Sequence, residues 1–229
     1  MSQDHRRYAP AAARNRDAIR EVLCRVLPTR GLVLEIASGS GEHVTHIAAA
    51  CGPDLIFQPS DPEPAARASI DAWRATLGLT NVRPAMALDA AAPEWPLSHA
   101  DAVLCINMIH IAPWSATVGL VQGAARILAP VSLAAPSAAH PQPASLAAPS
   151  AAHPQPAQGL LYLYGPFRRQ GHHTAPSNER FDADLRQQNP LWGVRDLEAV
   201  AALAAAAGFA PPQIEPMPAN NLSLLFYRS

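Results

Sequence analysis

Apolar segments of two kinds alternate along most of the chain. Short apolar runs, with the length of buried strands, cover residues 31–36, 55–58, 82–88, 100–106, 159–164, 213–217 and 222–227. Apolar residues at helical spacing between them predict helices over 14–27, 42–50, 64–77, 117–128 and 194–207. This alternation predicts a mostly parallel sheet with helices on both faces.

The last two predicted strands differ from the others in their connection. Only residues 218–221 separate them, which leaves no room for a crossover helix, so these two strands must be antiparallel. The pattern therefore predicts an α/β fold with seven strands, of which the last is antiparallel. A chain of 229 residues suits one domain over 1–229.

One segment interrupts the alternation. Residues 132–144 and 145–157 both read SLAAPSAAHPQPA, and a segment rich in proline and alanine cannot build a core. We expect a disordered, duplicated loop insertion over 131–158; a Pro-rich loop that binds a partner is the alternative. The insertion leads into the amino-terminal end of a strand, whereas ligands of parallel sheets bind at the carboxyl ends. We therefore expect it to lie away from the ligand site.

Composition excludes several classes of function. The net charge is −1 and the pI about 6.7, which argues against a nucleic-acid or anionic-membrane partner. All 17 basic residues are arginine, as expected of a GC-rich, bacterial genome. Three dispersed cysteines, a polar N-terminus and the lack of an apolar run of about 18 residues predict a cytoplasmic protein without a membrane span. The sequence does not indicate an oligomeric state.

The stretch LEIASGSGEH, residues 34–43, suggests a ligand site between a strand and a helix. Gly39 and Gly41 let the backbone turn sharply and let a ligand approach main-chain N–H groups. A dinucleotide would require a third glycine, but Val44 stands there, and Glu42 would oppose a pyrophosphate. Glu35 suits a cation, so S-adenosylmethionine, with its ammonium and sulfonium, fits better; a strand–turn–helix without a ligand is the alternative.

The ends of the next strands add acceptor groups at the same edge of the sheet. Asp61 can accept both ribose hydroxyls, and Asp89 can accept from an adenine amino group, although each alone could be a turn residue. Arg16, on an N-terminal arm, could pair bidentately with the cofactor carboxylate. The predicted cofactor-binding residues are Glu35, Ala37, Ser38, Gly39, Gly41, Asp61, Pro62, Asp89, Ala90, Asn107 and Arg16.

These residues resemble a known family. The segments 35–43, 60–62 and 88–89 are similar to class I S-adenosylmethionine-dependent methyltransferases, although Ala37 stands where many of those enzymes have glycine. The segments 9–16, 106–114, 177–186, 189–198 and 217–226 resemble a narrower subfamily that includes methyltransferase-like protein 26 and bacterial proteins with a domain of unknown function. The resemblance implies a Rossmann-like fold and S-adenosylmethionine as cofactor, but no particular methyl acceptor.

Methyl transfer mainly requires that the acceptor be positioned. His110, three residues after Asn107, is a candidate catalytic base, and Tyr164 also lies near the expected pocket; a packed loop histidine is the alternative. The polar stretch between the fifth strand and the next helix predicts a lid over the acceptor, with a solvated connection as the alternative. The predicted substrate-binding residues are His172, His173, Asn178, Arg180, Trp192 and Arg195.

The sequence thus predicts a methyltransferase of unknown acceptor; the neutral charge favours a small molecule, and a tRNA base or a protein side chain stays open. No metal is expected, because the histidines lack HxH or HExxH spacing. A non-catalytic S-adenosylmethionine-binding protein on the same fold remains an alternative. An NAD(P)-dependent reductase is disfavoured, because a Tyr-x-x-x-Lys pair is impossible in a chain without lysine.

Overall fold

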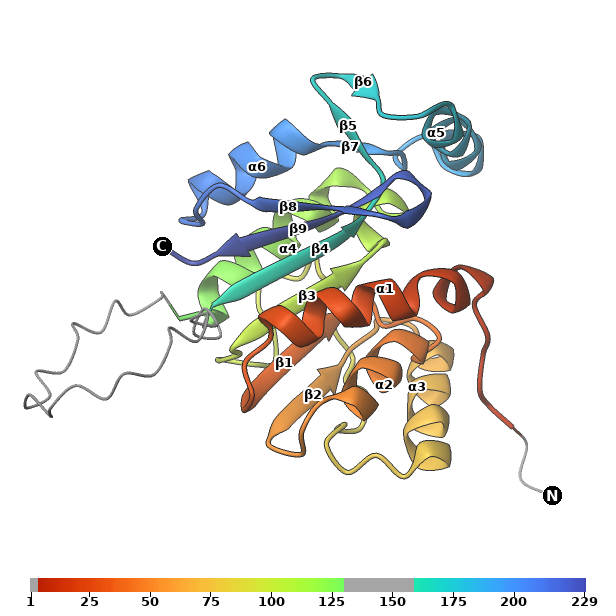
Figure 1. Ribbon diagram of the computed structural model, residues 1–229, viewed down its shortest axis with the longest axis vertical. Helices are drawn as coiled ribbons and strands as arrows, with labels where there is room; N and C mark the ends of the chain where they lie inside the picture. Colours follow the sequence, from red (N-terminus) through yellow and green to blue (C-terminus); the bar gives the residue numbers. More distant parts are fainter. Residues whose placement is uncertain (1–3, 130–158) are drawn as a thin grey trace, which may run out of the picture.

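The computed structural model describes residues 4–129 and 159–229, which fold around one mixed sheet (Figure 1). The strand order is β2(Leu55–Pro59), β1(Gly31–Ile36), β3(Ala102–Ile106), β4(Leu160–Gly165), β9(Asn221–Tyr227) and β8(Gln213–Met217). The first four run parallel, β9 is antiparallel to β4, and β8 is antiparallel to β9. The α/β fold and the antiparallel last pair agree with the prediction.

The strand predicted over 82–88 is not a strand in the structure, so the main sheet has six strands rather than seven. Only two isolated bridges, from Val82 and Met86, join this segment to the edge of the sheet. Pro84 has no N–H to donate, and the N–H of Ala85 turns away to Asp71 Oδ1, at 2.9 Å. A regular ladder therefore cannot form along this segment.

Helices cover both faces of the sheet. The side chains of β1, β3 and β4 alternate between two cores, so that Val33, Leu104 and Tyr162 lie in one and Leu34 and Leu163 in the other. The first core packs under α1(Pro10–Val26), α2(Glu42–Ala50) and α3(Pro64–Leu77); the second packs under α4(Trp114–Ile127) and α6(Leu197–Ala206). Figure 1 shows α1 crossing the face of the sheet.

The predicted lid region contains regular structure that the sequence did not indicate. It folds into α5(Pro176–Gln188) and a second sheet of the order β6(His172–His173), β5(Phe167–Arg169) and β7(Arg195–Asp196). Figure 1 shows α5 beyond the turn between β8 and β9. The segments η1(Met108–His110) and η2(Pro218–Asn220) are short 3₁₀ turns at the carboxyl ends of β3 and β8.

The predicted loop insertion over 131–158 lies outside the described residues. Its flanks come close together: a Cβ added at Gly159 would lie 2.3 Å from the carbonyl oxygen of Ala129. They meet where α4 ends and β4 begins, at the amino-terminal edge of the parallel strands. Within the two described ranges, no helix has both the length and the apolarity that a membrane span requires.

Candidate functional site

The loop between β1 and α2 is the centre of the candidate site. Its residues Ala37, Gly39 and Gly41 all have positive φ, of 55°, 57° and 89°. A Cβ at Gly41 would lie 2.8 Å from the Cα of Ile70 in α3, so this glycine is needed for the helices to pack. A Cβ at Gly39 would meet nothing nearer than the Ala37 carbonyl oxygen, at 4.0 Å. The loop is therefore tightly packed at Gly41 and open at Gly39.

Asp61 holds the open part of this loop. Its Oδ2 accepts the N–H of Gly39 at 3.0 Å and its Oδ1 accepts the N–H of Glu63 at 2.9 Å. The neighbouring Ser60 carbonyl accepts the N–H of Ser38 at 2.8 Å. Each carboxylate oxygen of Asp61 keeps acceptor capacity for a further hydrogen bond. The residue predicted to bind a ribose thus also shapes the glycine loop.

Glu35 is the most unusual group of the site. The side chain is 2% exposed, and its Oε2 has no hydrogen-bond partner among residues 4–129 and 159–229. Burial raises the pKa of Glu35 to about 7, an interaction with Ser38 lowers it, and the charge of Asp61 raises it further. Buried polar atoms in proteins nearly always have partners. The arrangement therefore suits a cationic ligand group that would satisfy the carboxylate.

Glu42 explains why a pyrophosphate does not fit. It begins α2, is 5% exposed, and its Oε2 accepts from the N–H of Ala9 at 2.6 Å and from Ser40 Oγ at 3.0 Å. A phosphate would approach the helix N-terminus that this buried acid occupies. The same contacts attach the N-terminal segment to the glycine loop.

Arg16 lies beside the first turn of α2. Asn15 Oδ1 is 2.8 Å from His43 Nε2, and the pKa of His43 is lowered to about 4 by burial and by the charges of His46 and Arg16. The buried Nε of Arg16 has no hydrogen-bond partner within the two described ranges. The structure thus places Arg16 near the glycine loop with a donor available for an anion. Asn15 was not among the predicted site residues.

Tyr164 lies at the carboxyl end of β4, opposite Ile106 in the register. It is 1% exposed, and in the described part of the chain its hydroxyl has no hydrogen-bond partner. Burial raises the pKa of Tyr164, while the nearby amides of Asn15 and Asn221 lower it. Sequence reasoning missed Asn221, although its place at the start of the last strand is a usable signal.

His110 is enclosed in the structure. Its ring is 1% exposed and lies edge-on to Phe167, with 5.1 Å between the ring centroids. Its Nδ1 accepts the N–H of Arg195 at 3.4 Å, and a Cβ on Gly165 would lie 2.4 Å from its Nε2. Burial and the charge of Arg195 lower the pKa of His110 to about 3. This is the packing expected of the alternative, a structural histidine; the catalytic role stays a prediction.

The other predicted cofactor residues occupy the same edge with varied exposure. Asp89 is exposed, and its Oδ1 accepts the N–H of Ala91 at 2.9 Å, so its other oxygen is available. Asn107 ends β3 with φ 64° and donates its N–H to the Tyr164 carbonyl at 2.8 Å. Pro62 is exposed, whereas Ala90 is buried against Gly119 of α4.

Three of the predicted substrate-binding residues have structural contacts. Arg195 donates to the carbonyl oxygens of Ile109, Ala112 and Leu191, which ties β7 to the loop after β3. Asn178 Nδ2 donates to Thr174 Oγ1 at 3.1 Å and to the Asn220 carbonyl at 3.0 Å. His173 Nε2 lies 3.5 Å from Asp182 Oδ2. His172 and Arg180 are exposed and Trp192 is partly buried.

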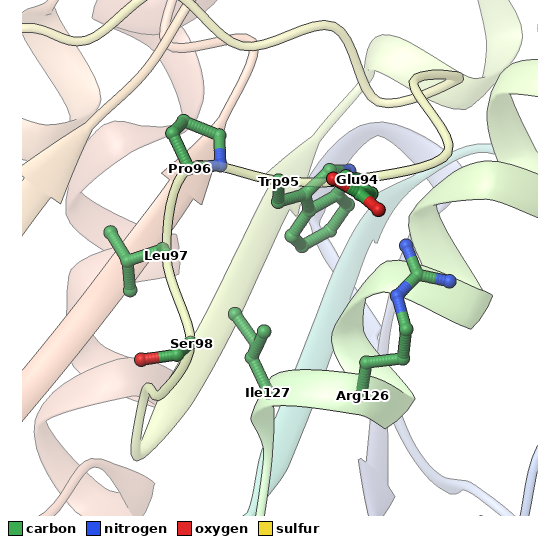
Figure 2. Close-up of a pocket in the computed structure, with 7 residues that line it drawn as sticks. All are labelled: Glu94, Trp95, Pro96, Leu97, Ser98, Arg126 and Ile127. Carbon is green, nitrogen blue, oxygen red and sulfur yellow. The ribbon is translucent and has the colours of Figure 1, made fainter.

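Two cavities in the described part of the chain lie away from this edge. The larger, of about 550 Å³, is lined by Trp95, Arg126 and neighbours where α4 ends and the chain enters β3 (Figure 2). The smaller, of about 170 Å³, lies between the ends of α1 and α2. Both are at the amino-terminal edge of the parallel strands. In the same residues, no cluster of three or more His, Cys, Asp or Glu side chains could hold a metal.

Comparison with solved structures shows that this chain has the fold of S-adenosylmethionine-dependent methyltransferases. An O-methyltransferase family 2 protein from Planctomyces limnophilus DSM 3776, in complex with apigenin, matches with a TM-score of 0.70 at 16% identity. The S-adenosylmethionine-dependent methyltransferase SibL matches with 0.69 at 17%, and the O-methyltransferase NcsB1 from neocarzinostatin biosynthesis, in complex with S-adenosylmethionine and 2-hydroxy-5-methyl naphthoic acid, with 0.67 at 15%. The alignments cover 95–96% of this chain but only 55–58% of those chains.

The family is shown by a separate comparison. A family model matches residues 6–135 and 140–228. The chain therefore belongs to the family described as "Protein of unknown function (DUF938)".

Proposed function

We propose that this protein is an S-adenosylmethionine-dependent methyltransferase with a small-molecule acceptor. The observation that carries the proposal is Glu35: a buried carboxylate with a free oxygen, beside a glycine loop that is open at Gly39. Among residues 4–129 and 159–229, no basic side chain forms an ion pair with Glu35. A ligand ammonium would supply the missing charge, and the fold is that of enzymes which use such a ligand.

Each part of the cofactor has a matching group at this edge. Glu35 would hold the ammonium and Arg16 the carboxylate; Asp61 would accept from the ribose hydroxyls and Asp89 from the adenine amino group. Bound S-adenosylmethionine supplies an electrophilic methyl group on sulfur. The contribution of the protein is to align an acceptor with that methyl group and to exclude water.

The acceptor would lie where β4 and β9 meet the first turns of α1. There Tyr164, Asn15 and Asn221 provide a hydroxyl and two amides, which suit hydrogen bonds to a neutral polar molecule. Helix α1 packs on this face of the sheet, and Asn178 of α5 donates to the carbonyl of Asn220, the neighbour of Asn221; this enclosure favours a small acceptor over a macromolecule. The resemblance of 106–114 and 217–226 to methyltransferase-like protein 26 supports the narrower subfamily as part of this proposal.

Calorimetric titration tests cofactor binding. We expect S-adenosylhomocysteine to bind and NADH not to bind. Glu35→Gln should weaken S-adenosylhomocysteine binding about tenfold or more, because it removes the charge that faces the ammonium. Glu198→Gln, on the exposed face of α6, is the matched control and should bind normally. Binding of NADH, or equal affinity of both variants, would refute the cofactor assignment.

A transfer experiment tests the activity itself. Protein with radiolabelled S-adenosylmethionine is incubated with small-molecule, RNA and protein fractions of a cell extract. We expect label in the small-molecule fraction. Label in RNA or protein instead would refute the acceptor class, and tight cofactor binding without transfer to any fraction would favour a non-catalytic binding protein.

A further inference from the structure

Helices α1 and α2 lie side by side and run in the same direction. Asn15 and His43, 28 positions apart, are joined by a side-chain contact of 2.8 Å. Asp17 and His46, 29 positions apart, are joined by another of 2.8 Å. Since both helices rise by the same amount per residue, this register continues along the pair.

The same register brings two cysteines together at the far end of the helices. Cys24 lies in the last turn of α1 and Cys51 is the residue after α2, so they are 27 positions apart. Both line the cavity of about 170 Å³, together with Leu27, Thr29 and Ala50. Cys24 is exposed and Cys51 partly buried, whereas Cys105 is buried elsewhere, in β3.

Electrostatics agree with contact between the two thiols. The pKa of Cys51 is raised to about 12, first by burial and then by the nearby Cys24 thiol. Since only Cys24 is exposed, an external reagent meets the Cys24 thiol first.

We propose that Cys24 and Cys51 form an oxidisable dithiol, a modification site for low-molecular-weight disulfides such as glutathione disulfide. The Cys24 thiolate attacks one sulfur of the reagent, which forms a mixed disulfide and releases one thiol. The Cys51 thiolate then attacks the Cys24 sulfur, which forms the Cys24–Cys51 bond and releases the second thiol. The two cysteines are oxidised, and one disulfide is reduced to two thiols.

The bond would tie the last turn of α1 to the end of α2. Arg16 lies in the amino-terminal half of α1 and His43 in the first turn of α2. The bond would therefore link, at the opposite edge of the sheet, two helices that border the glycine loop. A cross-link that closes a chain segment of this length restricts the unfolded state. The oxidised protein should therefore have a thermal unfolding midpoint several degrees higher than the reduced protein.

Differential alkylation with mass spectrometry tests the site. The full-length protein is equilibrated with glutathione disulfide, alkylated with iodoacetamide, and digested without reductant. We expect a peptide pair linked through Cys24 and Cys51 and an intact mass lower by two hydrogen atoms. Cys51→Ser should instead accumulate one glutathione on Cys24, and Cys24→Ser should acquire none. Cys105→Ser is the matched control and should form the same internal bond.

Other outcomes would overturn the proposal. In the wild-type protein, a stable glutathione adduct on Cys24, alkylation of both thiols after oxidation, or a disulfide between two chains would each show that the thiols do not pair. None of these readouts requires methyltransferase activity, so the proposal can fail or succeed independently of the function proposed above.

Discussion

The glycine loop after β1 and the segment from β5 to β7 border the same edge of the sheet but differ in how their polar groups are used. Around the loop, Glu35 and Arg16 keep buried atoms without partners. In the other segment, Arg195 and Asn178 donate to backbone carbonyls, although Arg168 Nε and His173 Nδ1 find no partner among the described residues. Polar residues are abundant in both regions, so abundance alone does not identify a binding group. A buried acid without a partner, such as Glu35, does so better, because an unpaired buried carboxylate costs more free energy than a neutral polar atom unless a ligand satisfies it.

The largest expected effect comes from Gly41→Ala. The added Cβ would meet the Cα of Ile70 at 2.8 Å while φ is 89°, so the free energy of unfolding should fall by roughly 3 to 5 kcal/mol. Urea denaturation measures this change in the free energy of unfolding. Gly39→Ala is the matched control: its site is open, so we expect a loss of about 1 to 2 kcal/mol but weakened S-adenosylhomocysteine binding. Equal destabilisation by both variants would show that the loop is not open at Gly39.

Glu35→Gln should change the pH dependence of stability. The pKa of Glu35 is about 7 in the folded protein against an ordinary value of 4.5, so the folded state holds this proton more tightly. The wild-type protein should therefore lose stability relative to the variant as pH rises from 4.5 to 7, by on the order of 3 kcal/mol.

Urea denaturation of both proteins at several pH values measures this difference. His43 and His110, whose pKa values are lowered, act in the opposite direction as pH falls, but they are common to both proteins and cancel. S-adenosylmethionine should restore the stability of the wild-type protein at pH 8. If the difference in the free energy of unfolding between the two proteins stays constant with pH, Glu35 is not a buried, unpaired acid.

Arg195→Ala tests whether the segment from β5 to β7 is held by structural contacts. It leaves three backbone carbonyls without their donor, so we expect a loss of about 2 kcal/mol in the free energy of unfolding, which urea denaturation measures. An unchanged stability combined with lost turnover would instead indicate that Arg195 binds the acceptor, as the sequence suggested.

Arg180→Ala should have the smallest effect on stability. The side chain is exposed on α5, and such substitutions change stability by about 0.5 kcal/mol or less. If this face of α5 meets the acceptor, turnover falls while the affinity for S-adenosylhomocysteine stays the same. An equal loss of turnover and of affinity for S-adenosylhomocysteine would argue against α5 as part of a lid over the acceptor.

Much of the fold could be predicted from the sequence, because it depends on local periodicity. Each strand of the parallel part and each covering helix appears where the apolar pattern placed it, within a few residues. The predicted strand over 82–88 was wrong because Pro84 has no N–H to donate and because the N–H of Ala85 bonds to Asp71, a partner that the local pattern does not indicate. The helix α5 was missed because its apolar face is small: of its residues only Asn178, Asp182 and Leu185 are buried.

The sequence by itself determined the layered α/β framework, the acid–glycine loop and the edge at which the strand-end acids gather, because these follow from chain order and local conformation. The tertiary structure alone decided which polar side chains stay without partners. The contact of Ala9 with Glu42 spans 33 positions, and that of Arg195 with Ile109 spans 86. Whether a group is satisfied depends on such distant neighbours, so the same residue types can serve a ligand at one position and hold the fold together at another.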